Sequence, residues 1–486
     1  MTSSSVELKS NDAKAEALEV ESVPNGRMTL RDELNDHPKN WKTPLKLCVY
    51  FNICLMAFLG NSYGAGITSG FGLLVKDLHT SYSELSAIIA YVLLVIGLGA
   101  FIWIPTAVVI GKRPVLVVSQ LVFIVACVWD IFFEKDYAKA MSFYSLCLCL
   151  GSQLGPLIGG HIMQNKGWRW FFILMAILAS FNFVTLVTAC PETAFELYIA
   201  DGSTGADVDA DILRHSEAGG PRQSTITTMR RNIIYFKHPH VRGGGIKQWV
   251  LSFLLQVEFL FDPIVLFASG LWGICIAWVA GISVINPQIF AMPPYLWGPA
   301  GIGNFAAASL IGGIIAIPFA GPLTDTVSRL IDKKRGKHMP EHRLISLIFP
   351  FLIAPPGLLI FGYTYPKGSY IAAAVGYAME LASLTLVPGA VLSYAVDSYP
   401  YDSAEAASLI NAVTHVISYA LSLTASDWLH DVGVSKMFLQ MAITQWAILA
   451  GIGGVLFVLG PRLRTKATHL HKTYGIKRLI HTGRGL

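Results

Sequence analysis

Long apolar runs separated by short polar segments dominate this chain from about residue 46 onward. A membrane-spanning helix needs about 20 consecutive apolar residues, and by that measure eleven segments are candidates. They are residues 46–69, 84–110, 114–130, 140–162, 168–189, 263–286, 301–323, 343–363, 369–396, 404–425 and 437–460. Glycine and proline recur inside them, which membrane helices tolerate because neighbouring helices satisfy the freed backbone groups. The pattern predicts an all-α membrane protein.

The polar segments divide the chain into five parts. Residues 1–45 lack the early apolar core of a signal peptide and are expected to form a disordered cytoplasmic tail. Residues 46–189 carry five candidate spans and residues 263–460 carry six, which predicts two transmembrane bundles. Residues 190–262 form a central cytoplasmic loop, whose short apolar run 249–260 is expected to lie in the membrane interface. Residues 461–486 form a basic cytoplasmic tail.

Composition agrees with this class and excludes several others. Hydrophobic residues make up 53% of the chain and charged residues 14%, with a mean hydropathy of +0.53, whereas soluble domains carry about 25% charged residues. The seven cysteines form no CxxC pair and are best explained as small buried apolar residues. No phosphate-binding GxxxxGK[ST] loop or HExxH motif occurs, so neither an ATPase nor a zinc enzyme is expected. The basic tail suits an anionic membrane surface rather than nucleic acid.

Lysine and arginine positions conflict with a count of eleven spans. The tail after Pro461 and the loop 324–343 are both basic, and the four spans between them place them on one side of the membrane. The basic turn Lys112-Arg113 also belongs in the cytoplasm, yet only three spans separate it from the basic part of the central loop at 230–247. One further span between about residues 129 and 139 would remove every conflict.

Several short motifs occur in a fixed order along the chain. They are DHPKNW (36–41), GKRPV (111–115), GSQLGPLIGG (151–160), GWRWFF (167–172), PETAF (191–195), GPLTD (321–325), PEHRL (340–344) and YAVDSYP (394–400). As a set they resemble the fungal drug/proton antiporter branch of the major facilitator superfamily, which includes multidrug and polyamine exporters. The resemblance covers about residues 36–465. It implies two six-helix bundles, a small organic substrate, no cofactor and a proton gradient as energy source.

The chain departs from that family plan at one place. Its third span runs directly into residues 131–146, which look like the loop and start of the family's fifth span. The fourth transmembrane helix is therefore expected to be missing, leaving about eleven helices instead of twelve. An annotation or splicing error is the preferred cause, and a genuine eleven-span variant or pseudogene product is the alternative.

One motif predicts close helix packing. Gly155 and Gly159 lie four residues apart on one helical face, where small residues let two helices approach, and Pro156 introduces a kink. The resemblance implies that the whole set marks antiporters, although ordinary packing explains it as well. The set comprises Gly151, Gly155, Pro156, Gly159 and Gly160.

Two basic loops are candidates for a cytoplasmic gate. In GPLTDTVSRLIDKKRG (321–336) the spacing of Asp325 and Arg329 allows an ion pair on one helix. The matching first-half loop keeps Lys112 and Arg113 without a nearby acid. The resemblance implies gating by these loops, and positive-inside charge is the simpler explanation. Lys334 and Arg335 complete the set.

Glu380 is the most informative single residue, because it lies near the middle of an apolar stretch. A carboxylate there costs about 2.5–3.5 kcal/mol on insertion scales. Our hypothesis is that Glu380 couples transport to protons or binds a cation, and a protonated packing residue is the alternative.

Other polar residues in apolar helices are weaker candidates for substrate or proton binding. His415 and Asn411 share a helical face, where the histidine could titrate or the pair could simply hydrogen-bond. Tyrosines could line a cavity for flat or cationic ligands or lie at the membrane interface. Asp397 and Glu405 flank a turn and are expected to be solvated. The remaining candidates are Tyr377, Tyr394, Tyr419, Asn61 and Tyr91.

These observations predict a major facilitator fold in the plasma membrane, acting as a monomer with protons and a small organic compound as partners. Proton-coupled efflux of a drug, polyamine or secondary metabolite is favoured. Proton-coupled uptake on the same scaffold and a transport-dead membrane protein are the alternatives.

Overall fold

The computed structural model describes residues 41–118, 134–190, 245–336, 339–399 and 403–474, and every regular element in these ranges is a helix. In chain order they are α3 (Thr43–Gly66), η2 (Ile67–Gly70), α4 (Phe71–Leu78), α5 (Tyr82–Ile110), α6 (Lys112–Val118), α8 (Glu134–Lys166), α9 (Trp168–Ala189), α12 (Gly245–Leu260), α13 (Pro263–Phe290), α14 (Pro299–Arg335), η3 (Pro340–Leu347), α15 (Ile348–Thr364), η4 (Tyr365–Lys367), α16 (Tyr370–Ser398), α17 (Ser403–Val432) and α18 (Val434–Tyr474).

Local sequence explains where several of these helices begin. Ser81 and Glu84 form a reciprocal capping box at the start of α5, which satisfies two backbone donors that the first turn leaves free. Asp262 caps α13 by accepting a hydrogen bond from the Ile264 amide at 2.8 Å. Gly167 separates α8 from α9 with a φ of 86°, a conformation that residues with a side chain rarely adopt.

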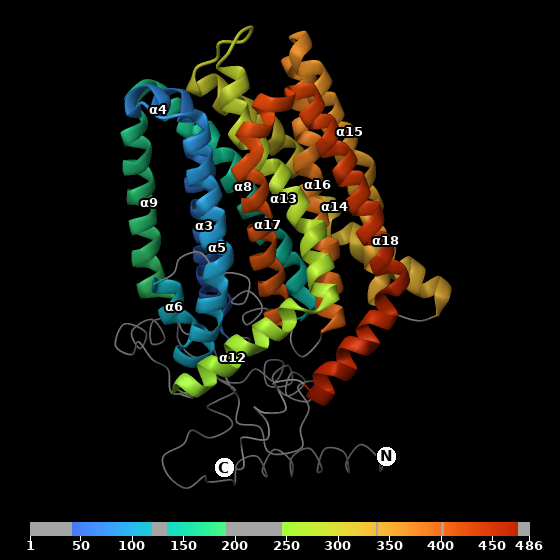
Figure 1. The fold of residues 1–486 in the computed structure, drawn as a ribbon. Helices are drawn as coiled ribbons and strands as arrows, with labels where there is room; N and C mark the ends of the chain where they lie inside the picture. Colours follow the sequence, from blue (N-terminus) through green and yellow to red (C-terminus); the bar gives the residue numbers. More distant parts are fainter. Residues whose placement is uncertain (1–40, 119–133, 191–244, 337–338, 400–402, 475–486) are drawn as a thin grey trace, which may run out of the picture.

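Nine segments of the described residues are long and apolar enough to cross a membrane, and they match nine of the eleven expected spans. The expected span 140–162 lies within α8, which runs among the other long helices (Figure 1). The expected span 114–130 lies outside the described residues after Val118.

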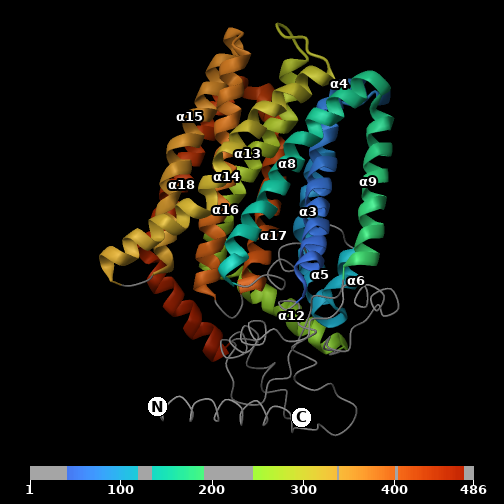
Figure 2. The same ribbon diagram turned by 180° about the vertical axis from the view of Figure 1, so that it is seen from behind.

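The long helices form two groups that stand side by side (Figures 1 and 2). In the first half, α3 packs against α8 and α9. In the second half, α13 packs against α17 and α18 in the same pattern. The two groups meet where α8 lies along α14 and α5 lies along α17.

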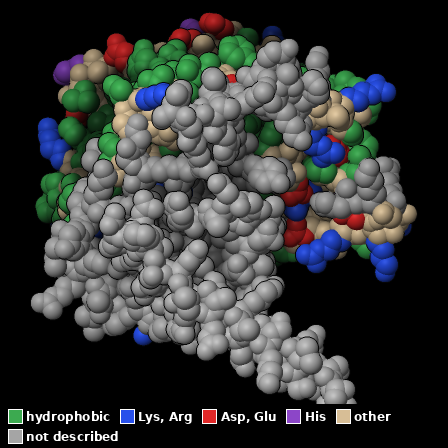
Figure 3. Space-filling view, turned by 90° about the horizontal axis from the view of Figure 1, so that it is seen from below, with side chains coloured by type: hydrophobic (Ala, Val, Ile, Leu, Met, Phe, Trp, Pro, Cys, Tyr) green, Lys and Arg blue, Asp and Glu red, His purple; other side chains and the backbone are tan. Residues whose placement is uncertain are grey.

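The amphipathic helix α12 runs across one end of the molecule, beneath α5 (Figure 1). The basic ends of α14 and α18 lie at the same end (Figures 1 and 2). Lysine and arginine side chains are visible around the edge of this face (Figure 3). Because cytoplasmic segments are enriched in these residues, we refer to it as the cytoplasmic end and to the opposite one as the outer end.

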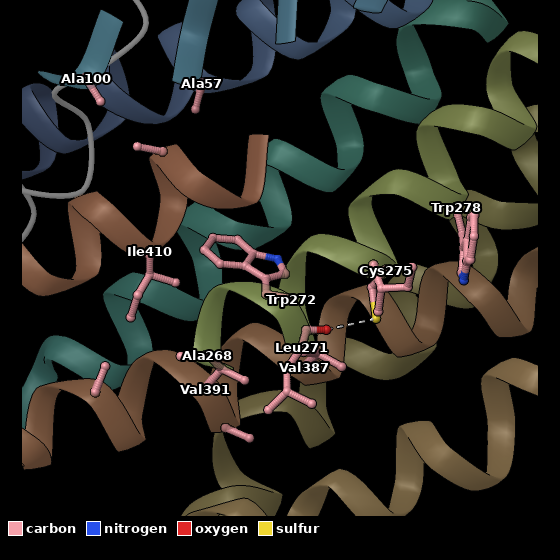
Figure 4. Packing of buried hydrophobic residues seen from close by; sticks show 14 of the residues in the cluster. Ala57, Ala100, Ala268, Leu271, Trp272, Cys275, Trp278, Val387, Val391 and Ile410 are labelled. Atoms are coloured by element: carbon pink, nitrogen blue, oxygen red, sulfur yellow. Dashed lines mark hydrogen bonds between the residues drawn. The ribbon is translucent and has the colours of Figure 1, made fainter. Parts of the chain in front are cut away.

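The core is centred on α13, along which Leu271, Trp272 and Cys275 are buried. Val387 and Val391 from α16 pack beside them (Figure 4). Because α13 and α16 are packed on several sides, their rotation about their own axes is fixed. This rotation determines the direction in which the polar side chains of α16 point.

The direction of α8 bears on the number of crossings in the first half. Gly151, Gly155 and Gly159 of α8 meet Phe58, Ser62 and Gly66 of α3 in the same order, so that the two helices are parallel. A single crossing between α5 and α8 would make α8 and α3 antiparallel, whereas no crossing, or two as in the twelve-helix plan, makes them parallel. The 23 residues 111–133 are too few for two crossings of about 20 residues each.

The second half contains one packing relationship that the described first half does not repeat. There, α16 fills the space between α13, α14 and α15. Within the described residues of the first half, no helix takes the corresponding place beside α3 and α5.

Candidate functional site

A buried polar cluster lies where the two helix groups meet. The Tyr377 hydroxyl of α16 donates to Gln153 Oε1 of α8 at 3.4 Å and lies 3.2 Å from Ser283 Oγ of α13. Ser309 Oγ of α14 donates to the same Gln153 oxygen at 2.6 Å. Phe305 stacks on the Tyr377 ring at a centroid distance of 5.9 Å. One first-half glutamine thus binds helices of the second half at a fully buried position.

Of this cluster, the sequence singled out only Tyr377. Gln153 lies inside the motif GSQLGPLIGG, so its position in an otherwise small-residue and apolar motif was a usable signal. Ser283 and Ser309 carried no such signal, because isolated serines are common in membrane helices, where their hydroxyls bond to the helix backbone.

Glu380 lies one turn further along α16 and points in another direction. It is fully buried, and its Oε1 accepts a hydrogen bond from Gln445 Nε2 of α18 at 3.2 Å. The same amide nitrogen lies 3.7 Å from Cys275 Sγ of α13. Glu380 Oε2 has no hydrogen-bond partner in the described structure. The carboxyl group is therefore enclosed within the second helix group rather than at its boundary with the first.

Tyr394 does not join these residues. It lies 14 positions after Glu380 on α16, about 21 Å along the helix axis. A Cβ added to Gly460 of α18 would lie 3.0 Å from its hydroxyl and 3.1 Å from Glu341 Cγ. Tyr394 is thus packed at the cytoplasmic end, away from Tyr377.

The remaining polar candidates make local contacts. His415 Nδ1 donates to the Asn411 carbonyl oxygen of its own helix at 2.7 Å, and Asn61 Nδ2 donates to the Ala57 carbonyl oxygen of α3 at 3.0 Å. Tyr91 of α5 and Tyr419 of α17 face each other across the two helix groups, with ring centroids 5.9 Å apart.

The glycine motif packs α8 against both groups at once. A Cβ on Gly155 would lie 2.6 Å from the Ser62 carbonyl oxygen of α3, and Gly159 packs on Gly66 of the same α3 segment. Gly160 lies against Pro299 of α14, and Gly303 of α14 lies against Pro156. The structure shows the close approach that the motif predicts, and places it at the junction of the two halves.

Polar contacts also join the two groups at the outer end. Gln164 Oε1 of α8 accepts from the Ala300 amide of α14 at 2.9 Å, and His161 Nε2 lies 2.8 Å from Asn304 Oδ1. Ser83 Oγ of α5 donates to Asp427 Oδ1 of α17 at 3.0 Å. The structure is therefore in a conformation whose two halves are in contact at the outer end.

At the cytoplasmic end, Asp325 has a different partner from the one expected. Its carboxylate pairs with Arg343 Nη1 of η3 at 2.9 Å, rather than with Arg329 of its own helix. Arg343 Nε also lies 2.6 Å from Asp397 Oδ2 at the end of α16. Asp397 is consequently ion-paired, with 19% of its side chain exposed, and not solvated as expected. The side chain of Glu405 lies outside the described residues.

The other candidate gate residues lie apart from this ion pair. Arg329 and Lys334 are exposed, and the side chain of Arg335 lies outside the described residues. Arg113 is buried and donates to the Val187 carbonyl oxygen of α9 at 2.7 Å. Lys112 is half-buried beside it. Val187 lies in the same half as Arg113, and Arg343 lies in the same half as Asp325.

Three consecutive residues of η3, Glu341, His342 and Arg343, join three helices of the second half. Glu341 pairs with Arg464 of α18 at 3.5 Å, His342 Nδ1 pairs with Asp332 of α14, and Arg343 pairs with Asp325 and Asp397. In the sequence, PEHRL (340–344) is recognisable only as one of the family motifs and predicts no role for these residues.

Next to this network, burial and then the Asp262 carboxylate raise the pKa of the Tyr399 phenol. Tyr399 therefore stays protonated, and its ring packs edge-on against Phe259 of α12 at a centroid distance of 5.4 Å.

Comparison with known proteins places this arrangement in a family. The family model described as Major Facilitator Superfamily matches residues 128–423. An uncharacterized MFS-type transporter of Schizosaccharomyces pombe is 20% identical over 524 residues, covering 91% of this chain and 88% of the relative. The protein HOL1 of Saccharomyces cerevisiae is 25% identical over 393 residues, covering 69% and 67%. The efflux pump FUB11 of Gibberella moniliformis is 25% identical over 312 residues, covering 64% and 49%.

Solved structures agree on the fold. The human organic anion transporter MFSD10 superimposes with a TM-score of 0.50 at 13% identity, covering 83% of this chain and 99% of that one. A POT family transporter in complex with 5-aminolevulinic acid gives 0.52 at 14% identity, covering 89% and 99%. With most of its length matched in sequence and in helical arrangement, the chain belongs to the Major Facilitator Superfamily and is a multi-pass membrane transporter of small molecules rather than an enzyme.

Proposed function

We propose that this protein is a proton-coupled exporter of small amphipathic or cationic organic compounds, acting as a monomer in the plasma membrane. The observation that carries the proposal is Glu380, an acidic residue that is fully buried within a membrane-spanning helix. Its only hydrogen bond in the described structure is to the neutral amide of Gln445.

An ionised carboxylate without a cation is very costly in such a place, whereas a carboxyl group that carries a proton is not. Glu380 would therefore hold a proton while it is enclosed and could release it once a rearrangement admits water. Such a rearrangement is inherent in transporters whose halves rock around a central site. This alternation is what couples proton movement to substrate movement.

The neighbouring cluster supports an organic substrate. Tyr377, one turn from Glu380, combines an aromatic face with a hydroxyl at the junction of the two halves, and Phe305 lies against its ring. Aromatic faces attract cations and flat ring systems. Export is supported by relatives that are named efflux pumps, FUB11 among them. Uptake through the same machinery is the second candidate.

We also propose that the first half of this chain lacks one crossing, the counterpart of α16. The parallel direction of α8 and α3 agrees with the two crossings that the twelve-helix plan places between α5 and α8, whereas the segment between them is long enough for at most one. A protein without this helix would lose part of the wall between α3 and α5. A transport-dead form is therefore the alternative if this chain is the mature product.

Transport in sealed vesicles separates these possibilities. Inside-out vesicles with an acidic lumen should accumulate a polyamine, a lipophilic cation or an amphipathic dye, and Glu380→Gln should abolish this accumulation because Gln cannot release a proton. The matched control Asp431→Asn removes an exposed acid at the outer end and should have no effect. Accumulation only in right-side-out vesicles with an acidic exterior would establish uptake instead. No accumulation in either orientation by folded protein would show that the chain does not transport these compounds.

A further inference from the structure

Helix α14 is much longer than the membrane it crosses. Its 37 residues, Pro299–Arg335, extend about 56 Å, whereas the hydrocarbon core is about 30 Å thick. Its cytoplasmic end projects sideways from the perimeter of the second helix group in both views (Figures 1 and 2). This end therefore lies next to the bilayer rather than beneath the protein.

One side of α14 changes from apolar to cationic along its length. Ile311, Ile315 and Phe319 are 58%, 62% and 53% exposed and are spaced four residues apart, as on a lipid-facing stripe. Thr326, Arg329 and Lys333 follow Phe319 at spacings of seven, three and four residues, and all three are exposed. Phe319 lies 20 residues after Pro299 at the outer end of α14, about 30 Å along the helix, which is the hydrocarbon thickness. Arg329 follows ten residues later, so the cations lie on the cytoplasmic side of the apolar core.

The acidic residues of the same segment lie along one edge of this side and have partners on η3. Asp325 pairs with Arg343 and Asp332 pairs with His342, both toward η3. Among the described residues, no ion pair is formed by Arg329, Lys333 or Lys334. Within the described part of the chain, the outward side therefore carries cations that no ion pair neutralises, with Leu330 beside them at 58% exposure.

We propose that this side, comprising Arg329, Leu330, Lys333 and Lys334, binds anionic phospholipid headgroups of the cytoplasmic leaflet. Each Lys or Arg near such a surface strengthens binding by about 1 kcal/mol, or about fivefold. Leu330 and the stripe above it contact the acyl chains of the same lipid. This continuity with the apolar face favours a phospholipid over free phosphate.

The test is lipid retention by the full-length chain, measured by native mass spectrometry after reconstitution in phosphatidylcholine with and without phosphatidylserine. Wild-type protein should retain phosphatidylserine in preference to phosphatidylcholine. Neutralising Arg329→Gln, Lys333→Gln and Lys334→Gln together should lower this preference roughly a hundredfold, the product of three fivefold steps. Arg329→Lys alone, which keeps the charge, should preserve it.

A matched control removes three exposed lysines at the outer end, Lys76, Lys367 and Lys436, each replaced by Gln. It should retain phosphatidylserine as wild type does. Equal loss in both triple variants, or no loss in the first, would overturn the proposal. Displacement of phosphatidylserine by inorganic phosphate would show an anion site rather than a lipid site. Thermal unfolding in phosphatidylcholine alone should be the same for all variants, which separates lipid binding from folding.

Discussion

The guanidinium group of Arg343 lies between two carboxylates, with Nε 2.6 Å from Asp397 Oδ2 and Nη1 2.9 Å from Asp325 Oδ1. This single side chain joins η3 to the cytoplasmic ends of α14 and α16. The two acids that it contacts lie 72 residues apart in the sequence. A charge-assisted pair of this kind fixes geometry as well as contributing energy.

Removing this guanidinium should destabilise the second helix group. Arg343→Ala leaves two half-buried carboxylates close together without the guanidinium between them, which we expect to lower the free energy of unfolding by about 1–3 kcal/mol. Thermal unfolding in detergent would measure the loss. Adding Asp397→Asn to Arg343→Ala should recover part of it, because the repulsion between the carboxylates is then relieved. An unchanged unfolding temperature of Arg343→Ala would show that the ion pairs of Arg343 do not stabilise the fold.

A methyl group on Gly155 should separate α8 from α3. Its Cβ would lie 2.6 Å from the Ser62 carbonyl oxygen and 2.8 Å from Ser62 Cα, and backbone atoms cannot move aside as a side chain can. Gly155→Ala is therefore expected to cost about 1–3 kcal/mol of stability and to reduce transport. The matched control is Gly64→Ala in α3, where nothing lies within 4 Å of the added Cβ and alanine favours the helix. Equal behaviour of the two variants would contradict the close contact.

The cluster around Gln153 should behave as one unit. Gln153→Leu leaves the Ser309 and Tyr377 hydroxyls without their shared acceptor, which we expect to cost about 1–3 kcal/mol. Tyr377→Phe removes one of the two donors and should cost less, about 1 kcal/mol. In a double-mutant cycle the combined variant should be more stable than the sum of the two losses predicts. Additive losses would mean that the two side chains act independently.

The segment between α6 and α8 should prove longer in the mature transcript. We expect the product amplified across the codons for Trp129 and Asp130 to encode a further apolar stretch with a basic cytoplasmic end, because the twelve-helix plan places two crossings between α5 and α8 and the 23 residues 111–133 are too few for them. Sequencing of that product is the measurement. A transcript that encodes only the present chain would establish the shorter form as real and would favour the transport-dead alternative.

The sequence by itself determined the membrane class, the approximate limits of the spans and the two-bundle organisation. These properties depend on whether about 20 successive residues are apolar, which is local information. It also identified Glu380, because an acid within an apolar run is anomalous without reference to any other residue. The basic segments showed in addition that a count of eleven spans is inconsistent, and the parallel direction of α8 and α3 is inconsistent with the same count.

Only the tertiary structure decided which side chains meet. Asp325 has Arg329 one turn away in its own helix, yet it pairs with Arg343 because the packing of η3 brings that guanidinium closer. Tyr377 and Glu380 are adjacent on α16, yet one contacts the other half of the protein and one is enclosed in its own. Gln153, Ser309 and Gln445 acquire their roles from helices far away in the chain. The rotation of each helix about its axis sets these contacts, and that rotation follows from packing against neighbours rather than from the hydropathy of the helix itself.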